Sequence, residues 1–264
     1  MEKLVEARDH SRAPVLYAEA ELMDAAQALA SRLQLPLANS ASRPLDVLAT
    51  QTRSDTLFLH LGAAGLSIMG SSMLLLPDFS LFKPRIRPDR LGRELVVRAV
   101  RIRGAETPVR VVDATAGLGE DAFLLAAAGF EVCMCEQNPI IAALLEDALR
   151  RAQQDLELAP IAARMRLIAG DAREILLQLD AAPDVVYLDP MFPERKKRSA
   201  VKKKLQLLQQ LEEPCDVAAE LLDAAIGAHP RKIVIKRPAK GPHLGQLKPA
   251  YSVAGKAIRF DVIP

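Results

Sequence analysis

The stretch Val111-Val-Asp-Ala-Thr-Ala-Gly-Leu-Gly-Glu-Asp-Ala-Phe123 decides the fold of this chain. An apolar strand ends here in the carboxylate Asp113, a loop follows that carries Gly117 and Gly119, and a helix then begins with two acids. Glycines let the backbone adopt positive φ and approach a ligand closely. In open α/β sheets such loops lie beyond the carboxyl ends of the strands, where ligands bind. The stretch therefore predicts a nucleotide-like ligand at the end of a parallel strand.

Strands and helices alternate at short spacing from residue 109 onward, which is typical of a parallel, doubly wound α/β sheet with helices on both faces. We expect strands at Val109–Asp113, Glu131–Glu136, Met165–Ala169, Val185–Asp189 and Lys232–Lys236. We expect helices at Asp121–Ala128, Pro139–Asp155, Arg173–Leu179 and Lys202–Ala228. The predicted fold class is Rossmann-like.

The first 80 residues read differently and predict a small N-terminal α+β lobe, leaving residues 81–264 as the main domain. The lobe should hold a strand at Val15–Ala18 and a helix at Glu21–Leu33. Two further strands, Thr56–Leu61 and Leu66–Met69, should be joined by the glycine turn between them. A helix over Asp89–Val100 should lead into the main domain.

The residues after Gly119 indicate which ligand the loop holds. A dinucleotide loop has the pattern G-x-G-x-x-G and packs a pyrophosphate against a helix N-terminus. Here Ala122 replaces the third glycine, and Glu120 and Asp121 would repel a pyrophosphate. The acids suit a ligand with a positive sulfonium and an amino group. We therefore expect Asp113 and Asp121 to face the methionine end of S-adenosylmethionine (SAM).

Acids also follow the next two strands. Glu136 ends the second strand, where an acidic side chain can accept hydrogen bonds from both ribose hydroxyls. Asp171 follows the third strand and could accept the adenine amino group, while Ala172 offers its backbone amide. Acids at successive strand ends, all on one rim, predict a single cofactor site.

The fourth strand runs into Asp189-Pro-Met-Phe-Pro193, which is similar to the D/N-P-P-Y/F loop of enzymes that methylate exocyclic amines. The lone pair of an aryl amine is delocalised into the ring, so the nitrogen is a poor nucleophile. An acceptor for the amine hydrogen favours the sp³-like nitrogen that attack requires. We expect Asp189 and the Pro190 carbonyl to be such acceptors and Phe192 to stack on the base.

Directly after this loop comes a basic run, which predicts binding of a phosphate-rich substrate beside the catalytic loop. Its members are Arg195, Lys196, Lys197, Arg198, Lys202, Lys203 and Lys204. The arginines between Lys83 and Arg110 could extend the surface, as could Arg231, Lys232, Lys236, Arg237 and Lys240. With three tyrosines and no tryptophan, shape-led binding with one base in a pocket is expected.

Composition narrows the context. The 264 residues carry a net charge of +2 and half of them are hydrophobic, so a large core can form. The three cysteines and four histidines show no metal-ligand or disulfide spacing. No apolar stretch is long enough for a signal peptide or a membrane span. We expect a cytoplasmic protein with no membrane association and no metal.

Taken together, these motifs resemble the RsmJ family of bacterial small-subunit rRNA methyltransferases, over residues 75 to 261. Further matching segments are Glu136-Gln-Asn-Pro139, Lys202-Lys-Lys204, Ile235-Lys-Arg-Pro238 and Arg259-Phe-Asp261. The resemblance implies a class I SAM-dependent methyltransferase fold and formation of N2-methylguanosine at guanine 1516 of 16S rRNA. It assigns cofactor contacts to Glu120, Asp121, Glu136, Gln137, Asp171, Ala172 and Asp189. The partner implied is 16S rRNA or the small ribosomal subunit, bound by a monomer.

Three alternatives stay open at this point. Asp189 could serve any aryl amine, so adenine-N6 or another nucleic-acid amine is a rival substrate. A nicotinamide-dependent oxidoreductase is disfavoured by the missing third glycine and by the acids Glu120 and Asp121. A non-catalytic RNA-binding module is disfavoured by the complete set of strand-end acids.

Overall fold

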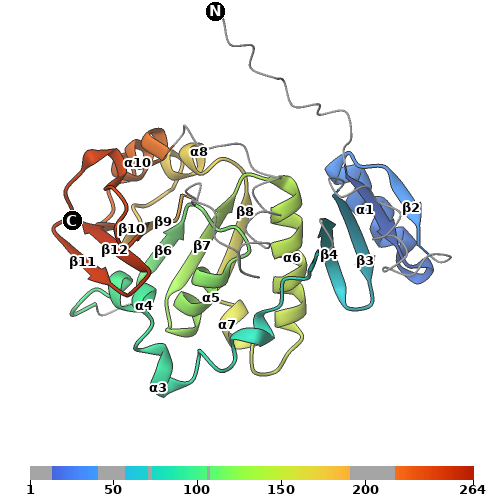
Figure 1. The fold of residues 1–264 in the computed structure, drawn as a ribbon, viewed down its shortest axis with the longest axis horizontal. Coiled ribbons are helices and arrows are strands. Elements are labelled where there is room, and N and C mark those ends of the chain that lie inside the picture. Colours follow the sequence, from blue (N-terminus) through green and yellow to red (C-terminus); the bar gives the residue numbers. More distant parts are fainter. Residues whose placement is uncertain (1–13, 41–56, 71–72, 106–107, 191–217) are drawn as a thin grey trace, which may run out of the picture. The chain divides into compact units, whose positions relative to one another are not determined.

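The computed structural model describes residues 14–40, 57–70, 73–105, 108–190 and 218–264. Of these, the residues up to Leu76 form one compact unit and those from Pro77 onward form a second (Figure 1). The units meet in sequence four residues before the boundary at residue 80 that the sequence suggested.

The smaller unit contains a five-stranded sheet in the order β2-β1-β3-β4-β5. The strands are β1 (Val15–Ala18), β2 (Leu37–Asn39), β3 (Phe58–Gly62), β4 (Gly65–Gly70) and β5 (Met73–Leu75). β1 runs parallel to β2 and β3, while β3, β4 and β5 are antiparallel. The helix α1 (Met23–Leu33), which follows the short η1 (Ala20–Leu22), contacts β1 and β2. The predicted α+β character and the glycine hairpin are confirmed.

The larger unit contains a seven-stranded sheet in the order β11-β12-β10-β9-β6-β7-β8. Five strands are parallel to one another: β6 (Arg110–Asp113), β7 (Glu131–Glu136), β8 (Met165–Ala169), β9 (Val185–Leu188) and β10 (Lys232–Pro238). β12 (Ile258–Ile263) is antiparallel to β10, and β11 (Tyr251–Ala254) is antiparallel to β12. All five parallel strands were predicted from the sequence.

The strand order reverses between β6 and β9. The chain passes from β6 to β7 and β8 on one side and then returns to β9 on the other side of β6. At such a switch point the loops after neighbouring strands diverge, which opens a crevice at the carboxyl ends of the strands. The loops that follow β6 and β9 are the glycine loop and the Asp189 loop, so the fold brings the two motifs together.

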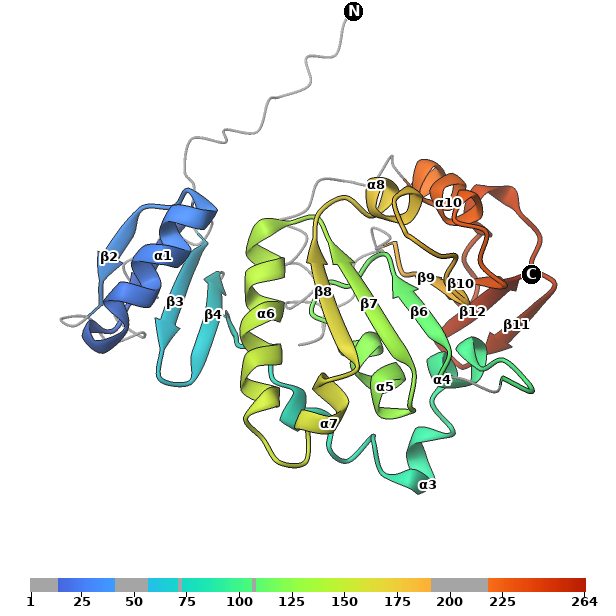
Figure 2. The same cartoon turned by 180° about the vertical axis from the view of Figure 1, so that it is seen from behind.

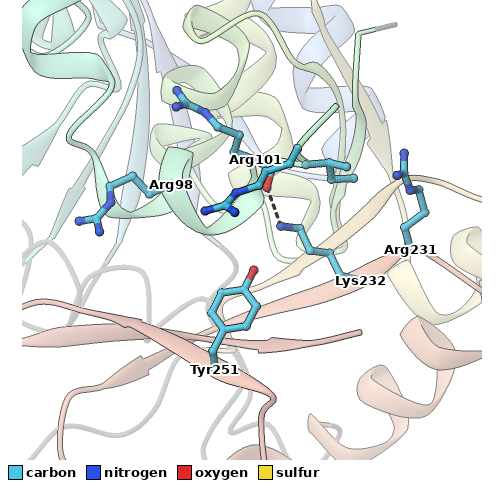
Figure 3. A pocket seen from close by; sticks show the side chains of 7 residues that line it. Arg98, Arg101, Arg231, Lys232 and Tyr251 are labelled. Atoms are coloured by element: carbon cyan, nitrogen blue, oxygen red, sulfur yellow. Dashed lines mark hydrogen bonds between the residues drawn. The ribbon is translucent and has the colours of Figure 1, made fainter. Parts of the chain in front are cut away.

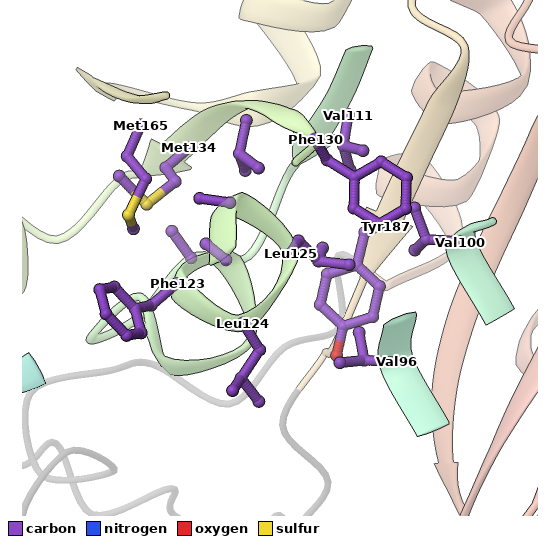
Figure 4. Close-up of a cluster of buried hydrophobic side chains, with 14 of the residues drawn as sticks. Val96, Val100, Val111, Phe123, Leu124, Leu125, Phe130, Met134, Met165 and Tyr187 are labelled. Atoms are coloured by element: carbon purple, nitrogen blue, oxygen red, sulfur yellow. The ribbon is translucent and has the colours of Figure 1, made fainter. Parts of the chain in front are cut away.

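Helices cover both faces of this sheet because alternate strand residues point to opposite sides. Val111 and Val185 belong to a core with α4 (Leu95–Val100), α5 (Glu120–Ala127), α6 (Pro139–Gln153) and α7 (Ala159–Ala162) (Figure 4). Their neighbours Val112 and Val186 belong to a second core with α8 (Ala172–Leu177) and α10 (Ala218–Gly227). α8 and α10 lie side by side (Figures 1 and 2). The doubly wound arrangement is confirmed.

The expected helix over Asp89–Val100 was wrong in its continuity. The structure has two short helices, α3 (Pro88–Leu91) and α4, with Glu94 in extended conformation between them. Gly92 ends the first helix, and glycine lowers helix stability by about 1 kcal/mol relative to alanine. The pair β11 and β12, the helix α7 and the short turns η2 (Phe79–Phe82) and η3 (Leu244–Gln246) were not predicted.

Candidate functional site

The loop after β6 is fixed across the ends of three strands. The Ala114 N–H donates to the Tyr187 carbonyl on β9, 3.0 Å away, and the Ala116 N–H donates to the Cys135 carbonyl on β7, 3.1 Å away. The Gly117 N–H donates to a carboxylate oxygen of Glu136 at 2.9 Å. These bonds hold the loop rigidly over the switch point without using side chains of the loop itself.

Both loop glycines have positive φ, but their surroundings differ. Gly117 has φ 53° and a Cβ built there would meet no protein atom within 4 Å. Gly119 has φ 73°, and its Cβ would lie 2.7 Å from Leu145 Cδ1 and 3.3 Å from the Phe79 ring. Gly119 is therefore required for packing of the loop on α6, whereas Gly117 leaves its backbone open toward a ligand.

This difference predicts separate effects of two matched substitutions. We expect Gly119→Ala to lower the free energy of unfolding by about 2 kcal/mol or more, because left-handed strain of about 1–2 kcal/mol adds to a steric clash. Gly117→Ala should cost only the strain, and it should weaken cofactor binding instead. Urea unfolding and titration with S-adenosylhomocysteine measure both effects. Equal stability losses in the two variants would contradict the assignment.

Two aspartates share one lysine beside this loop. Lys236 Nζ on β10 lies 2.7 Å from Asp121 Oδ2 and 2.8 Å from Asp189 Oδ2. The buried Tyr187 hydroxyl also donates to Asp121 Oδ2, at 2.7 Å. Burial, followed by the nearby negative charge of Asp121, raises the pKa of this tyrosine well above its ordinary value. The hydroxyl therefore stays protonated and acts as a donor to Asp121.

Asp189 is held from its backbone as well. Its N–H donates to Thr115 Oγ1 at 2.6 Å, which ties the start of the Asp189 loop to the glycine loop. Burial raises the pKa of Asp189, and the Lys236 charge acts in the opposite direction. The ion pair with Lys236 thus favours the ionised carboxylate at the carboxyl end of β9.

Asp113 is the most deeply buried acid of the group, with 2% of its surface exposed. Burial, together with the negative charges of Asp121 and Asp189, raises its pKa to about 8, although the Thr115 N–H bond and the Lys236 charge act in the opposite direction. Asp113 therefore carries a proton at neutral pH. A ligand with positive charge beside it would favour its ionised form.

The raised pKa of Asp113 predicts a stability effect. The unfolded chain loses this proton near its ordinary value of 3.8, whereas the folded protein keeps it to about pH 8. Between these values the folded state binds more protons, so the free energy of unfolding falls as pH rises, by up to about 1.4 kcal/mol per pH unit. Asp113→Asn should flatten this slope in urea unfolding between pH 5 and 8. An unchanged slope would show that Asp113 does not retain its proton.

Glu136 at the end of β7 is fixed by backbone donors. One carboxylate oxygen accepts from Gly117 and the other accepts from the Asn138 N–H at 2.8 Å. Burial raises the pKa of Glu136, and these backbone bonds oppose the rise. A carboxylate has about four lone-pair positions, so it retains capacity for a further donor. The carboxylate is placed between the glycine loop and α6.

The four remaining predicted cofactor residues differ in burial and in their hydrogen bonds. Asp171 caps α8, and its two oxygens accept four hydrogen bonds from the Arg173 backbone and guanidinium. Ala172 is buried as the first residue of α8. Glu120 is half-buried in the first turn of α5, and Gln137 is exposed. The side-chain acceptors of Asp171 are thus already engaged by a neighbouring arginine.

Part of the predicted catalytic and RNA-binding set lies outside the described residues. Asp189 and Pro190 are described, and Pro190 is buried. Phe192 and the whole basic run, Arg195, Lys196, Lys197, Arg198, Lys202, Lys203 and Lys204, fall in the segment 191–217 that the structure does not describe.

The expected extension of the RNA surface was wrong for several residues. Lys236 points into the acid cluster, because Lys232, Val234 and Lys236 alternate onto the face of β10 that carries α5. Lys232 and Arg237 are buried, and both donate to backbone carbonyls. Lys83 and Arg85 form ion pairs inside the larger unit, with Asp155 and Glu94 among their partners.

Sequence reasoning also missed Tyr187 and Thr115 as members of the site. Strand alternation could have placed Tyr187, because it lies two residues before Asp189 and therefore on the same face of β9. Within the described residues no three His, Cys, Asp or Glu side chains form a group that could hold a metal ion. No described helix combines the length and the apolar character needed to cross a bilayer.

The charge of the site fits a cationic ligand. Asp113, Asp121 and Asp189 gather around the glycine loop, and Lys236 is the cation paired with two of them. SAM carries a sulfonium and an ammonium group, which the carboxylates of Asp121 and Asp189 would attract, and such a cation would also favour the ionised form of Asp113. The open backbone at Gly117 provides the close approach that such a ligand needs.

Known proteins are similar to this chain over most of its length. A model of SAM-dependent methyltransferases matches residues 42–264. Ribosomal RNA small subunit methyltransferase J of Thioalkalivibrio sulfidiphilus is 42% identical over 257 residues, which cover 96% of this chain and 97% of the relative. The protein of that name from Pseudomonas aeruginosa is 47% identical over 172 residues, 65% of this chain and 66% of its own.

The solved structures agree with this relationship. The crystal structure of a SAM-dependent methyltransferase from Neisseria gonorrhoeae has a TM-score of 0.69 and 31% identity to this chain, with 94% of each chain covered. The strand order, the glycine loop at the switch point and the acid cluster are those expected of a Rossmann-like class I methyltransferase. The chain belongs to the family of SAM-dependent methyltransferases that includes the ribosomal RNA small subunit methyltransferases J.

Proposed function

We propose that this SAM-dependent enzyme methylates the exocyclic N2 of a guanosine in 16S rRNA of the small ribosomal subunit, and that the base is guanine 1516. The relatives named ribosomal RNA small subunit methyltransferase J support the substrate class. The observation that carries the proposal is the Asp189 carboxylate, which Lys236 and Thr115 hold at the end of β9 beside the glycine loop.

We assign the ends of the cofactor to the rim as follows. Asp113, Asp121 and Asp189 provide the negative charge for the methionine ammonium and the sulfonium. Glu136 accepts from the ribose hydroxyls, and Gly117 and Gly119 shape the loop that the nucleoside crosses. Glu120 and Gln137 complete the contacts at the starts of α5 and α6.

The adenine end of SAM binds at the N-terminus of α8. The Ala172 amide is at the helix N-terminus, where the helix dipole favours hydrogen bonds to ring nitrogens. Asp171 accepts from the adenine amino group once the Arg173 guanidinium, which donates to its oxygens, moves away. Arg173 also pairs with Glu220, which offers it an alternative partner.

The chemistry at the amine depends on Asp189. When bound, SAM supplies an electrophilic methyl group on its sulfonium. Asp189 Oδ2 is paired with Lys236, so Oδ1 accepts a hydrogen bond from the guanine amino group, and the Pro190 carbonyl accepts another. These bonds hold the nitrogen lone pair out of conjugation with the ring. Burial raises the pKa of Asp189, so its carboxylate can also take the proton that the amine releases.

The substrate is held by residues beyond the site. Phe192 stacks on the target base, and the basic run from Arg195 to Lys204 binds the neighbouring phosphates. An RNA substrate would bring its phosphates close to the catalytic loop. The position of the basic residues, directly after that loop in sequence, fits such a substrate.

A monomer without metal would act in the cytoplasm, where small ribosomal subunits are assembled.

Transfer of labelled methyl from SAM tests the proposal. The substrate should be small ribosomal subunits from a strain that lacks the corresponding gene, followed by digestion and nucleoside separation. Label in N2-methylguanosine is expected. Label in N6-methyladenosine would refute the base assignment, and absence of label in subunits and in naked 16S rRNA would refute the rRNA substrate.

A further inference from the structure

A second basic feature lies at the opposite edge of the large sheet from the acid cluster. An open cavity of about 670 Å³ is lined by Arg98, Arg101, Arg103, Arg231, Lys232 and Tyr251 (Figure 3). Lys232 begins β10 and Tyr251 begins β11, so the cavity is at the amino ends of these strands. Lys236 of the acid cluster is four residues further along β10, a separation of about 13 Å at 3.3 Å per residue.

The cavity holds far more positive than negative charge. Arg98, Arg101, Arg103 and Arg231 are all exposed, and Arg231 makes an ion pair with Asp184 at 3.6 Å. Within the described part of the chain, the other three guanidinium groups form no ion pair. Like charges placed together raise the free energy of the folded protein, and a bound polyanion would relieve that repulsion.

One of the residues that line the cavity is a buried lysine. Lys232 is only 8% exposed, and its Nζ donates to the Ala99 carbonyl at 2.7 Å and to the Arg101 carbonyl at 3.0 Å. Burial, followed by the nearby charge of Arg231, lowers the pKa of Lys232. Its bonds fix the backbone that carries Arg101 and Arg103, so the guanidinium groups start from a rigid segment.

Tyr251 adds an aromatic surface to this group. Its ring is 52% exposed, and its hydroxyl points toward Arg101 and Lys232 (Figure 3). A phenol can donate to a phosphate oxygen, and its ring can stack on an unpaired base. Guanidinium groups match phosphate oxygens through paired N–H donors. Small-molecule pockets are mostly apolar and enclosing, unlike this open and charged surface.

We propose that this basic cavity binds the phosphate backbone of the RNA substrate, at a site separate from that of methyl transfer. The inference rests on the proposed function, because a substrate that reaches both edges of the sheet must be as large as a folded RNA. The carboxyl edge then selects the base, and the amino edge fixes the orientation of the RNA on the enzyme.

Charge reversal tests the site. We expect the triple variant Arg98→Glu, Arg101→Glu, Arg103→Glu to raise the KM for small ribosomal subunits on the order of tenfold or more. The salt dependence of its binding to a 16S rRNA transcript should fall by about 2 to 3 in log–log slope, because about 0.7 to 0.9 is lost per phosphate contact. Turnover at saturating substrate and S-adenosylhomocysteine affinity should stay unchanged.

A matched control makes the test specific. The variant Arg166→Glu, Lys248→Glu, Lys256→Glu changes the same charge on exposed basic residues that do not line the cavity and lie outside the predicted RNA surface. Thermal unfolding identifies a misfolded variant, for which the milder pair Arg98→Ala, Arg103→Ala replaces the reversal. An unchanged KM and salt slope, or an equal loss in this control variant, would overturn the proposal.

Assays of the wild-type enzyme distinguish a failure of this inference from a failure of the proposed function. If the wild-type protein transfers no methyl to subunits, the proposed function fails, while transcript binding by the two charge variants still measures the cavity. If the wild-type protein transfers methyl and the cavity variant binds the transcript with an unchanged salt slope, only the cavity assignment fails.

Discussion

Asp189→Asn is expected to lower kcat by a factor of about 10² to 10³, which corresponds to about 2.7–4 kcal/mol of lost transition-state stabilisation. Asparagine keeps the size of the side chain but is uncharged, and its NH2 group puts a donor at one of the two positions that face Lys236 and the amine. RNA affinity should stay close to that of the wild type, because phosphate contacts dominate it. Single-turnover methyl transfer measures the chemical step.

Asp180→Asn is a suitable control for this variant. Asp180 is an exposed aspartate after α8 and lies outside the acid cluster. Its replacement should leave kcat unchanged. Near-wild-type turnover by Asp189→Asn would remove Asp189 from the mechanism, whereas equal losses in both variants would indicate a general effect of lost surface charge.

Lys236→Met is expected to lower kcat/KM by about a hundredfold at pH 7 and to shift the acidic limb of the pH profile upward. Lys236 lowers the pKa of Asp189 against the effect of burial, so without it the carboxylate ionises at higher pH. Asp121 and Asp189 would also lose their shared cation, which leaves two partly buried carboxylates close together without a counter-charge. Part of the activity should therefore return as pH rises.

The recovery at high pH distinguishes an electrostatic role from a structural one. Lys248→Met serves as the control, because Lys248 is an exposed lysine shortly after η3 that was assigned to no site. It should change neither kcat/KM nor the pH profile. A Lys236→Met enzyme with reduced activity and an unshifted profile would show that Lys236 supports the packing of β10 and not the ionisation of Asp189.

The sequence was sufficient for the part of the fold that is encoded locally. Each parallel strand from β6 to β10 is a short apolar run, and the acids that follow β6, β7, β8 and β9 mark the carboxyl edge. Topology then brings these ends together, because consecutive parallel strands share an edge. Asp113, Gly117, Glu136 and Asp189 were placed at the site for this reason.

The pairing inside the site could not be predicted from local pattern. Lys236 meets Asp121 from 115 positions further along the chain, and a lysine in a basic segment is more often solvated than buried. Strand alternation puts Lys236 on the same face of β10 as Val234, which is a core position. Recognising that alternation would have been the available signal for an inward-facing lysine.

The strand β12 was missed for a similar reason. Arg259 and Asp261 interrupt its apolar residues, yet both are buried, and Arg259 Nε donates to Asp261 Oδ1 at 2.8 Å. The same guanidinium donates to the carbonyls of Pro238, Ala239 and Gly241. Arg259 and Asp261 are paired with each other, and Arg259 also donates to distant backbone carbonyls. In the sequence alone, two such charged residues look like part of a solvated loop.

The most direct measurement of the central claim is the mass of the 16S rRNA fragment that contains guanine 1516, isolated from a strain lacking the corresponding gene. The strain should express either the wild-type chain or Asp189→Asn. The account predicts that the wild-type chain adds the mass of one methyl group to this fragment, on N2 of the guanine, and that Asp189→Asn does not. A fragment left unmodified by the wild-type chain, or modified equally by both chains, would contradict it.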